Sequence, residues 1–284
     1  MRRRQFMKIA MNGLLLVPAR LTKLNWFPMR RKNTFLLNPY FLEVLKPSLL
    51  QIAKPSWKIN RVVVGGGSKF EQMAAIYAPV SRFTQVAVSA GNRPVIVAGD
   101  CCISIAIMAA FQKTKLHPTL IYFDAHGDFN TPETSPSGFT GGMPLAMLMG
   151  LGDQTLMRLC GARPLQAANV ILTDGRNLDP GEDKAVEISG IYHYNSISEL
   201  QAHPFGKGPV YVHIDADVIN PDDAPAMLYP AKGGPGKKEL ARVFEFLKTQ
   251  TDIRAISMGA WEPSLDPAGK TEQVCLELLQ DLYS

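Results

Sequence analysis

The chain has 284 residues, of which 46 % are hydrophobic and 19 % are charged, a composition that excludes a disordered chain and supplies ample material for a core. The net charge of +5 comes largely from Arg and Lys residues near the amino terminus rather than from a basic stripe along the body. The charge pattern therefore predicts no nucleic-acid partner.

Cysteine content and hydropathy favour a cytoplasmic protein without a membrane partner. Four cysteines do not form a dense disulfide framework, and adjacent Cys101 and Cys102 disfavour a bond to each other. No stretch approaches the roughly 18 consecutive apolar residues of a spanning helix. Residues 3–8, Arg-Arg-Gln-Phe-Met-Lys, resemble a twin-arginine export signal. Asn12 and Gly13 interrupt the apolar stretch that follows, which argues against export.

Apolar runs alternate with segments of helical spacing along the chain. The first strand is expected at Leu14–Val17, followed by an irregular stretch through Pro39 and a region of helical spacing from Phe41 to Ile52. Further strands are expected at residues 61–64, 94–98, 169–172, 191–194 and 254–259, and in the apolar runs that begin at Leu120 and Val210. Helices are expected at residues 70–77, after Pro79, and at 105–111, 145–149, 237–248 and 271–282.

This alternation predicts an α/β fold, a three-layer α/β/α sandwich with a mainly parallel central sheet. No linker, repeat or low-complexity tract divides the chain. We therefore expect one domain over residues 1–284, with a divergent amino-terminal segment at residues 1–58.

Polar side chains follow three of the expected strands, where parallel sheets bind ligands, and the first of these strands leads into Asp100 and Cys101. Asp124 and His126 project the same way because strand side chains alternate, and Asp128 can fold back from the loop after Gly127. Another strand ends in Asp215 and Asp217. Carboxylates and an imidazole suit a hard divalent cation. Two acid-tipped strands therefore predict one shared metal centre, whereas separate roles as caps and turn residues would explain any one of these acids but not all of them.

Together, Gly99-Asp100-Cys101, Asp124-Ala125-His126-Gly127-Asp128 and Asp215-Ala216-Asp217 closely resemble the metal-binding motifs of the arginase (ureohydrolase) family. The resemblance runs in order and spacing from about Val62 to Leu265. It also includes Asn130-Thr131-Pro132, Ser137-Gly138, Asp179-Pro180-Gly181-Glu182, Gly233-Gly234 and Pro263-Ser264-Leu265.

The resemblance implies two Mn²⁺ ions bridged by a hydroxide that attacks a guanidinium carbon and releases urea or a relative. It implies that Asp124 and Asp215 bridge the metals. Asp128 and Cys101 would complete one metal site, and His126 and Asp217 the other, with Asp128 and His126 also acting in catalysis. Two such metals, ~3.5–4 Å apart, can hold a hydroxide at neutral pH and stabilise a tetrahedral intermediate.

Three positions depart from the family pattern. Cys101 stands where the family has a histidine ligand, and its thiolate favours Zn²⁺ or leaves one metal loosely held. For an isolated cysteine, a buried inert thiol would be the better interpretation. The proton-shuttle histidine of the family falls on Gly141, and its guanidinium-anchoring glutamate falls on Ala260. Glu262, two positions later, is the remaining candidate for that anchor.

The positions that hold the amino-acid end of the substrate are retained. The resemblance implies that Asn130 and Ser137 bind an α-carboxylate and that Asp179 and Glu182 bind an α-amino group. An amino-acid substrate follows, with arginine or a modified guanidine such as Nω-hydroxyarginine as the expected class. Nω-hydroxyarginine has a lower pKa than arginine and depends less on an anchoring carboxylate.

Two alternatives remain open. A non-catalytic relative could bind metal or an amino acid without hydrolysing it, as the changes at Cys101, Gly141 and Ala260 indicate. The second alternative is hydrolysis of a different C–N bond, as in agmatinase or formimidoylglutamase relatives. Ser137 and Asp179 argue against agmatine, which has no carboxylate. Family members commonly form trimers or hexamers, so the resemblance also implies a homo-oligomer.

Overall fold

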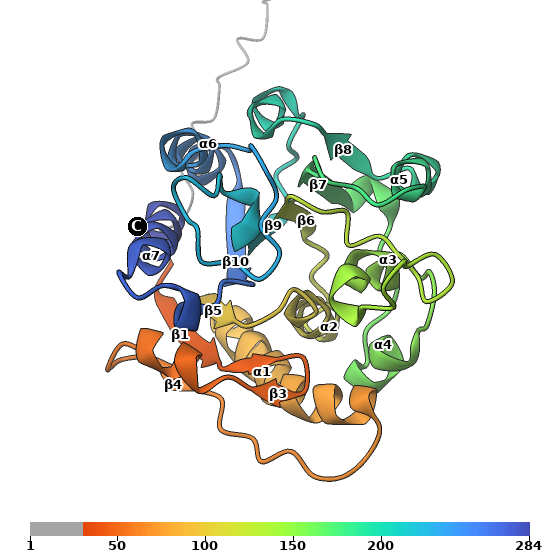
Figure 1. The fold of residues 1–284 in the computed structure, drawn as a ribbon, viewed down its shortest axis with the longest axis vertical. Helices are drawn as coiled ribbons and strands as arrows, with labels where there is room; N and C mark the ends of the chain where they lie inside the picture. Colours follow the sequence, from red (N-terminus) through yellow and green to blue (C-terminus); the bar gives the residue numbers. More distant parts are fainter. Residues whose placement is uncertain (1–30) are drawn as a thin grey trace, which may run out of the picture.

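The computed structural model describes residues 31–284, so the expected strand at Leu14–Val17 and the twin-arginine stretch lie outside the described residues. Eight parallel strands form the central sheet in the order β4-β1-β5-β10-β9-β6-β7-β8 (Figure 1). Their bounds are β4 (Lys58–Ile59), β1 (Asn33–Asn38), β5 (Arg93–Ala98), β10 (Asp252–Gly259), β9 (Pro209–Asp215), β6 (Thr119–Asp124), β7 (Val170–Asp174) and β8 (Tyr192–Tyr194). The predicted parallel sheet is confirmed.

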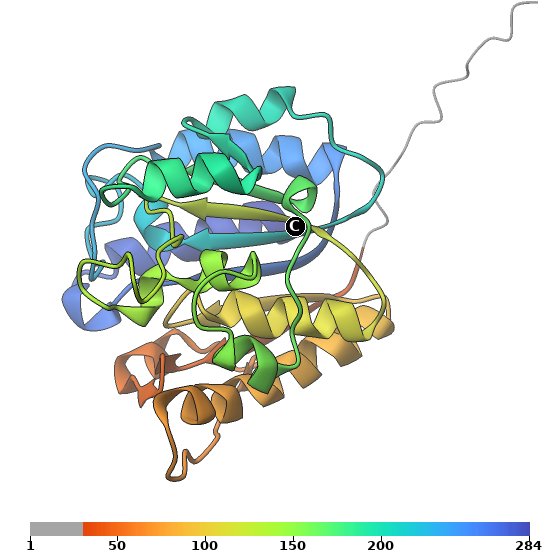
Figure 2. The same ribbon diagram turned by 90° about the vertical axis from the view of Figure 1, so that its right-hand side faces the viewer.

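Helices cover both faces of this sheet, and Figure 2 shows the strands between them. On one face α1 (Lys69–Ser89) packs against α2 (Ile103–Lys113) and α4 (Thr155–Cys160), and on the other α6 (Lys237–Gln250) packs against α7 (Lys270–Tyr283). The remaining elements are α3 (Pro144–Leu148), α5 (Glu182–Ser189), an antiparallel pair β2 (Tyr40–Phe41) and β3 (Val44–Leu45), and six 3₁₀ turns, η1 (Pro47–Ile52), η2 (Thr140–Gly142), η3 (Ala167–Asn169), η4 (Ile197–Ala202), η5 (Ala216–Val218) and η6 (Pro263–Leu265).

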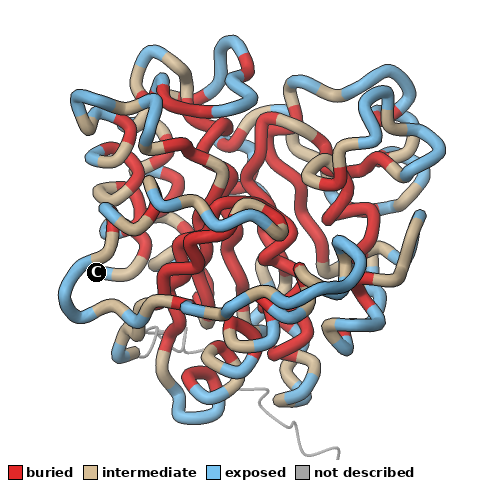
Figure 3. Tube along the Cα trace, turned by 60° about the horizontal axis from the view of Figure 1, so that its bottom comes forward, coloured by how far each residue is buried: buried red, intermediate tan, exposed pale blue. Residues whose placement is uncertain are grey.

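The apolar strands are continuous hydrophobic runs because both faces of the sheet are covered. In β6, Leu120 and Tyr122 belong to the core beneath α1 and α2, whereas Ile121 and Phe123 belong to the core beneath α6 and α7. All four side chains are fully buried. Figure 3 shows buried segments concentrated in the middle of the molecule, with exposed loops around them. The rigid sheet thus fixes the ends of β5, β6 and β9 relative to one another.

Three expectations near the amino end are corrected. The region from Phe41 to Ile52 is not a helix but β2, β3 and the 3₁₀ turn η1. Residues 61–64 form no strand; Val63 is 93 % exposed, so its β-branched side chain finds no sheet partner. The stretch through Pro39, expected to be irregular, contains β1. This strand pairs with both β4 and β5, so residues 33–38 of the divergent segment are part of the sheet.

A further difference concerns α1, which continues through Pro79 for 21 residues where the sequence indicated two helical segments. Its start is stabilised by a capping box, in which Ser68 and Glu71 exchange hydrogen bonds with each other's backbone. No helix between residues 31 and 284 is both long and apolar enough to cross a membrane.

Candidate metal centre and substrate cavity

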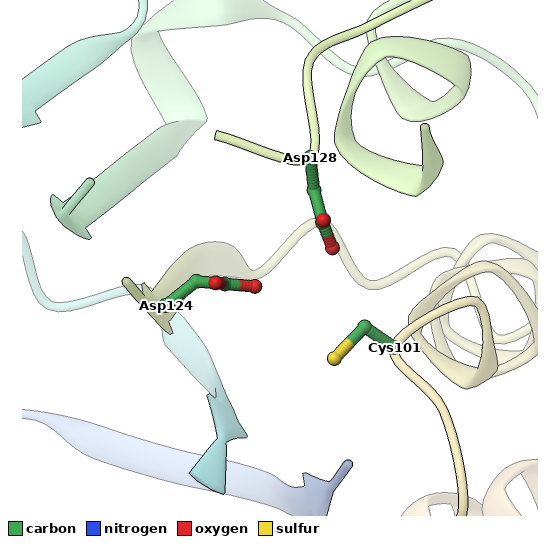
Figure 4. Close-up of side chains that lie close together, drawn as sticks. All are labelled: Cys101, Asp124 and Asp128. Carbon is green, nitrogen blue, oxygen red and sulfur yellow. The ribbon is translucent and has the colours of Figure 1, made fainter. Parts of the chain in front are cut away.

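Three strands of the sheet, β5 and the adjacent pair β9 and β6, deliver the predicted ligands to one edge, with β10 lying between β5 and β9. Cys101 follows β5, Asp124 ends β6 and Asp215 ends β9. Figure 4 shows the side chains of Cys101, Asp124 and Asp128 pointing toward a common point. One ligand atom from each of these three residues lies within 4.8 Å of the others, and the same holds for Asp124, His126 and Asp217. Two candidate ligand groups therefore share Asp124. Asp215, the other carboxylate expected to bridge, belongs to neither group.

The group around His126 is held by hydrogen bonds to the backbone. Asp124 Oδ1 accepts from the His126 N–H at 2.7 Å, and Asp217 Oδ1 accepts from the Ala125 N–H at 3.1 Å. His126 Nδ1 lies 2.9 Å from Asp217 Oδ2. Asp124 Oδ2 is buried and has no hydrogen-bond partner within residues 31–284. An orphaned buried carboxylate oxygen is expensive unless a cation satisfies it.

The group around Cys101 is arranged differently. The Cys101 thiol donates to Asp215 Oδ2 at 2.8 Å, and the Tyr122 hydroxyl donates to Asp128 Oδ2 at 2.6 Å. Asp215 Oδ1 accepts from the Asp217 N–H at 2.8 Å. Both carboxylates therefore already accept hydrogen bonds from this chain. A metal at this position would displace the thiol proton, because coordination deprotonates a thiol.

Electrostatics at the centre reflect crowded negative charge. Burial, with repulsion from neighbouring carboxylates, raises the pKa of Asp124 and Asp215 well above the usual range. Burial likewise raises the pKa of the Cys101 thiol, and it raises the pKa of Asp128 to about 7 against the hydrogen bond from Tyr122. Burial lowers the pKa of His126, but the hydrogen bond and charge of Asp217 outweigh it and raise the value to about 9.

This donor set fits a pair of divalent cations. Four buried carboxylates, Asp124, Asp128, Asp215 and Asp217, converge with one imidazole and one thiol. Cations would offset their mutual repulsion and satisfy the orphaned oxygen of Asp124. Oxygen and imidazole ligands at the His126 group suit Mn²⁺, whereas the thiol at the other group suits Zn²⁺.

A cavity of about 340 Å³ opens beside these residues. Among its lining residues are four that the sequence assigned to the substrate, namely Asn130, Ser137, Asp179 and Glu182. Asn130 Nδ2 donates to Asp179 Oδ2 at 2.8 Å, which ties the loop after β6 to the loop after β7. The four predicted amino-acid contacts and five of the six predicted metal ligands, all but Asp124, thus line one cavity.

Glu182 has a structural role that the sequence did not indicate. Its Oε1 accepts from the Phe129 N–H at 2.8 Å and its Oε2 from the Asp179 N–H at 2.9 Å. A Cβ at Gly127 would lie 2.5 Å from Glu182 Cδ, so this approach requires glycine. Because each oxygen already accepts from the backbone, Glu182 holds the cavity loops in place as well as lining the cavity.

Glu262 is corrected as a substrate contact. Ala260 lines the cavity, whereas Glu262 is not among the lining residues. Glu262 Oε1 accepts from the hydroxyls of Ser48 and Ser264, and Oε2 lies 3.4 Å from Lys46 Nζ. The chain turns at Ala260, where φ is +67°, and Glu262 instead caps η6 and joins it to η1.

Two features of the site carried little signal in the sequence. Arg176 follows β7, binds both oxygens of Asp174 at 3.0 Å and donates to the carbonyl of Asp217 at 2.9 Å; an arginine two residues after an acid-tipped strand was the available clue.

The rings of Phe41, Phe139 and Tyr229 also line the cavity. They come from segments far apart in sequence, so only the fold brings them together.

Comparisons with known proteins agree with this architecture. Residues 56–284 match the model of the Arginase family. The chain is 30 % identical over 239 residues to an arginase of Bacillus subtilis, covering 79 % of this chain and 81 % of that protein. It is 30 % identical over 187 residues to an N(omega)-hydroxy-L-arginine amidinohydrolase of Streptomyces lavendulae, covering 62 % and 66 %. A crystal structure of arginase from Bacillus subtilis superposes with a TM-score of 0.75 at 24 % identity, over 89 % of this chain and 99 % of that one.

Proposed function

The chain belongs to the arginase family, and from that membership we propose that it is a dinuclear-metal amidinohydrolase acting on a guanidino amino acid. Its substrate would be arginine or a relative such as Nω-hydroxyarginine, and its products ornithine and urea or hydroxyurea. The observation that carries the proposal is the convergence of the candidate ligands from β5, β6 and β9 on the cavity that Asn130, Ser137 and Asp179 also line.

Six residues would hold the metals. Asp124 and Asp215 would be shared, Cys101 and Asp128 would complete one position, and His126 and Asp217 the other. Two Mn²⁺ ions, or Zn²⁺ at the Cys101 position, would supply Lewis-acid activation of water and substrate. The orphaned Asp124 Oδ2 and the crowded carboxylates support this assignment.

The residues of the loops after β6 and β7 would orient the substrate. Ser137 Oγ accepts from the Phe139 N–H at 3.2 Å, which leaves its hydroxyl proton to donate to an α-carboxylate. Asn130 uses one amide N–H for Asp179, which leaves the second for the same carboxylate. Asp179 offers a negative charge to an α-ammonium group. Such positioning converts attack by water into an effectively intramolecular step.

Asp128 would move the proton. Its Oδ2 is held by Tyr122 at 2.6 Å, so that the orientation of the carboxyl group is fixed. From there Asp128 would take a proton from the attacking water and deliver it to the leaving δ-nitrogen. With glycine at 141, no side chain of that residue takes part in this transfer.

We expect Nω-hydroxyarginine to be a better substrate than arginine. Ala260 lines the cavity at the position expected for the family's anchoring glutamate, and its methyl group cannot pair with a guanidinium. A hydroxyguanidine is neutral more often than a guanidine. Its binding is therefore weakened less by the absence of that carboxylate. The proposal thus ranks Nω-hydroxyarginine above arginine.

Colorimetric assays for urea and hydroxyurea with Mn²⁺-loaded protein test the proposal. We expect product from at least one of the two substrates and none from Asp124→Asn, which removes the shared ligand charge. If neither compound is turned over, the proposal is wrong. Isothermal titration calorimetry on the same samples then tests the second candidate, a non-catalytic protein that binds an amino acid, which the hydrogen-bonded Cys101 thiol favours.

A further inference from the structure

An aromatic wall, made of Phe41, Phe139 and Tyr229, lines the same cavity as the candidate metal ligands. The rings of Phe41 and Phe139 stack with centroids 6.0 Å apart, and those of Phe139 and Tyr229 lie 5.1 Å apart. Three segments contribute to it: β2, the loop before η2 and the loop after β9. The wall therefore joins three segments that lie far apart in the sequence.

Phe139 fills the space that a side chain at residue 141 would need. A Cβ built on Gly141 would lie 2.3 Å from Phe139 Cε1 and 2.4 Å from Cζ. The space next to Gly141 is thus filled by the aromatic ring of Phe139 and not by solvent. Ala260 packs against the same apolar cluster as Phe41 and Phe139. This region of the cavity consequently presents rings and a methyl group.

The charges beside the aromatic wall decide what it can bind. Lys46 Nζ lies 5.5 Å from the centre of the Phe41 ring, and Lys69 Nζ donates to Thr140 Oγ1, next to Phe139. Lys46, which also lies 3.4 Å from Glu262 Oε2, already occupies a face of the Phe41 ring, so a second cation would have to compete with it there. Tyr229 is 51 % exposed, so its ring offers apolar surface that a neutral group can cover.

We propose that the aromatic wall is a subsite for an apolar alkyl or aryl substituent on the terminal guanidino nitrogen, so that the preferred substrate is an N-substituted guanidino amino acid. This inference rests on the proposed hydrolase function. Water adds to the guanidino carbon, the bond from that carbon to the δ-nitrogen breaks, and the proton goes to that nitrogen. The products are ornithine and an N-substituted urea, and no oxidant or reductant is needed.

Ornithine release from L-arginine and from its Nω-methyl, Nω-propyl and Nω-benzyl derivatives tests the subsite. We expect kcat/KM to rise about twofold to fourfold for each methylene that the wall covers. Tyr229→Ala and Phe139→Ala should abolish that rise when the kcat/KM of each derivative is compared with the same variant's value for arginine. Tyr192→Ala, an exposed aromatic outside the cavity, is the matched control and should keep the rise.

The outcomes separate the subsite from the hydrolase function. Preference for arginine over every substituted derivative would overturn the subsite while leaving the function intact. If no compound yields ornithine, the proposed hydrolase function is wrong. Calorimetric binding of the same series then tests the subsite on its own. Tighter binding with longer substituents that Tyr229→Ala removes supports the subsite, and equal affinities contradict it. Because Tyr229 is exposed, its variant keeps the test valid even if Phe139→Ala does not fold.

Discussion

The thiol of Cys101 donates a 2.8 Å hydrogen bond to Asp215 Oδ2. This contact joins the ends of β5 and β9. The thiol is a neutral hydrogen-bond donor, because burial raises its pKa well above the usual value. The two candidate metal positions are therefore unequal. The position with His126 and Asp217 offers imidazole and carboxylate donors, and a metal there displaces a His126 proton whose pKa is raised to about 9. The position with Cys101 offers a buried thiol that holds its proton more tightly.

Replacing Cys101 tests this inequality. Protein loaded with Co²⁺ should show a sulfur-to-cobalt charge-transfer band in the near ultraviolet, and Cys101→Ser should lose it. In Cys101→His, Mn²⁺ affinity at the weaker position should rise about tenfold or more, since imidazole suits Mn²⁺ better than a thiol does. Absorption spectra and calorimetric titration provide the measurements. Identical spectra in wild type and Cys101→Ser would place the sulfur outside the coordination sphere.

Metal removal should lower the stability of the wild type, and Asp124→Asn should raise the stability of the metal-free protein. In the wild type, Mn²⁺ at about 100 times its dissociation constant contributes roughly 2.7 kcal/mol, so chelation should lower Tm. Without metal, Asp124→Asn relieves buried like-charge repulsion and should melt above the metal-free wild type. Differential scanning fluorimetry with and without chelator measures both. A metal-free variant that melts below the metal-free wild type would contradict the account of crowded charge.

Arg176 should be needed to position the loop that carries Asp217. Its guanidinium binds Asp174 and the carbonyls of Asp217, Val218 and Ala231, a planar fork that lysine cannot reproduce. We expect Arg176→Lys to cost about 2 kcal/mol of unfolding free energy. It should also raise KM or the metal dissociation constant. Arg158→Lys, at an exposed position on α4, is the control; equal losses in the two variants would argue against the bracing role.

Phe139 and Gly141 should behave as a coupled pair. Gly141→His forces a Cβ into the Phe139 ring and should destabilise the protein by about 1–3 kcal/mol. Adding Phe139→Ala makes room, so the double variant should be less destabilised than the sum of the single variants predicts. A double-mutant cycle by chemical denaturation gives the interaction energy. Additive losses would show that the ring does not occupy that space.

The acid-tipped strand ends were predictable from the sequence because buried parallel strands are uncharged apolar runs and their acids follow at spacings of two. β6 with Asp124, His126 and Asp128 illustrates this. Strand β1 was not predictable from the sequence, because it forms by pairing with β5, and the local sequence does not encode that pairing. Glu262 shows the limit of spacing alone: the turn at Ala260, with φ at +67°, sends it to Ser48 and Lys46 instead of the cavity.

The aromatic wall was also beyond the sequence. Phe41 lies in β2, and Phe139 and Tyr229 lie in two separate loops, so their proximity follows from the fold rather than from any motif. The sequence showed that Gly141 lacks the side chain of the family's histidine. Only the packing showed that the Phe139 ring fills the space of that side chain.

Release of ornithine tests the central claim most directly, because every arginine derivative yields the same amino acid whatever its nitrogen substituent. Metal-loaded wild type would be incubated with arginine, Nω-hydroxyarginine and the Nω-alkyl derivatives, and ornithine measured by mass spectrometry. We predict ornithine from at least one compound with the wild type and none with Asp124→Asn. No ornithine from any compound, or equal amounts from the wild type and Asp124→Asn, would contradict a metal-dependent guanidino hydrolase.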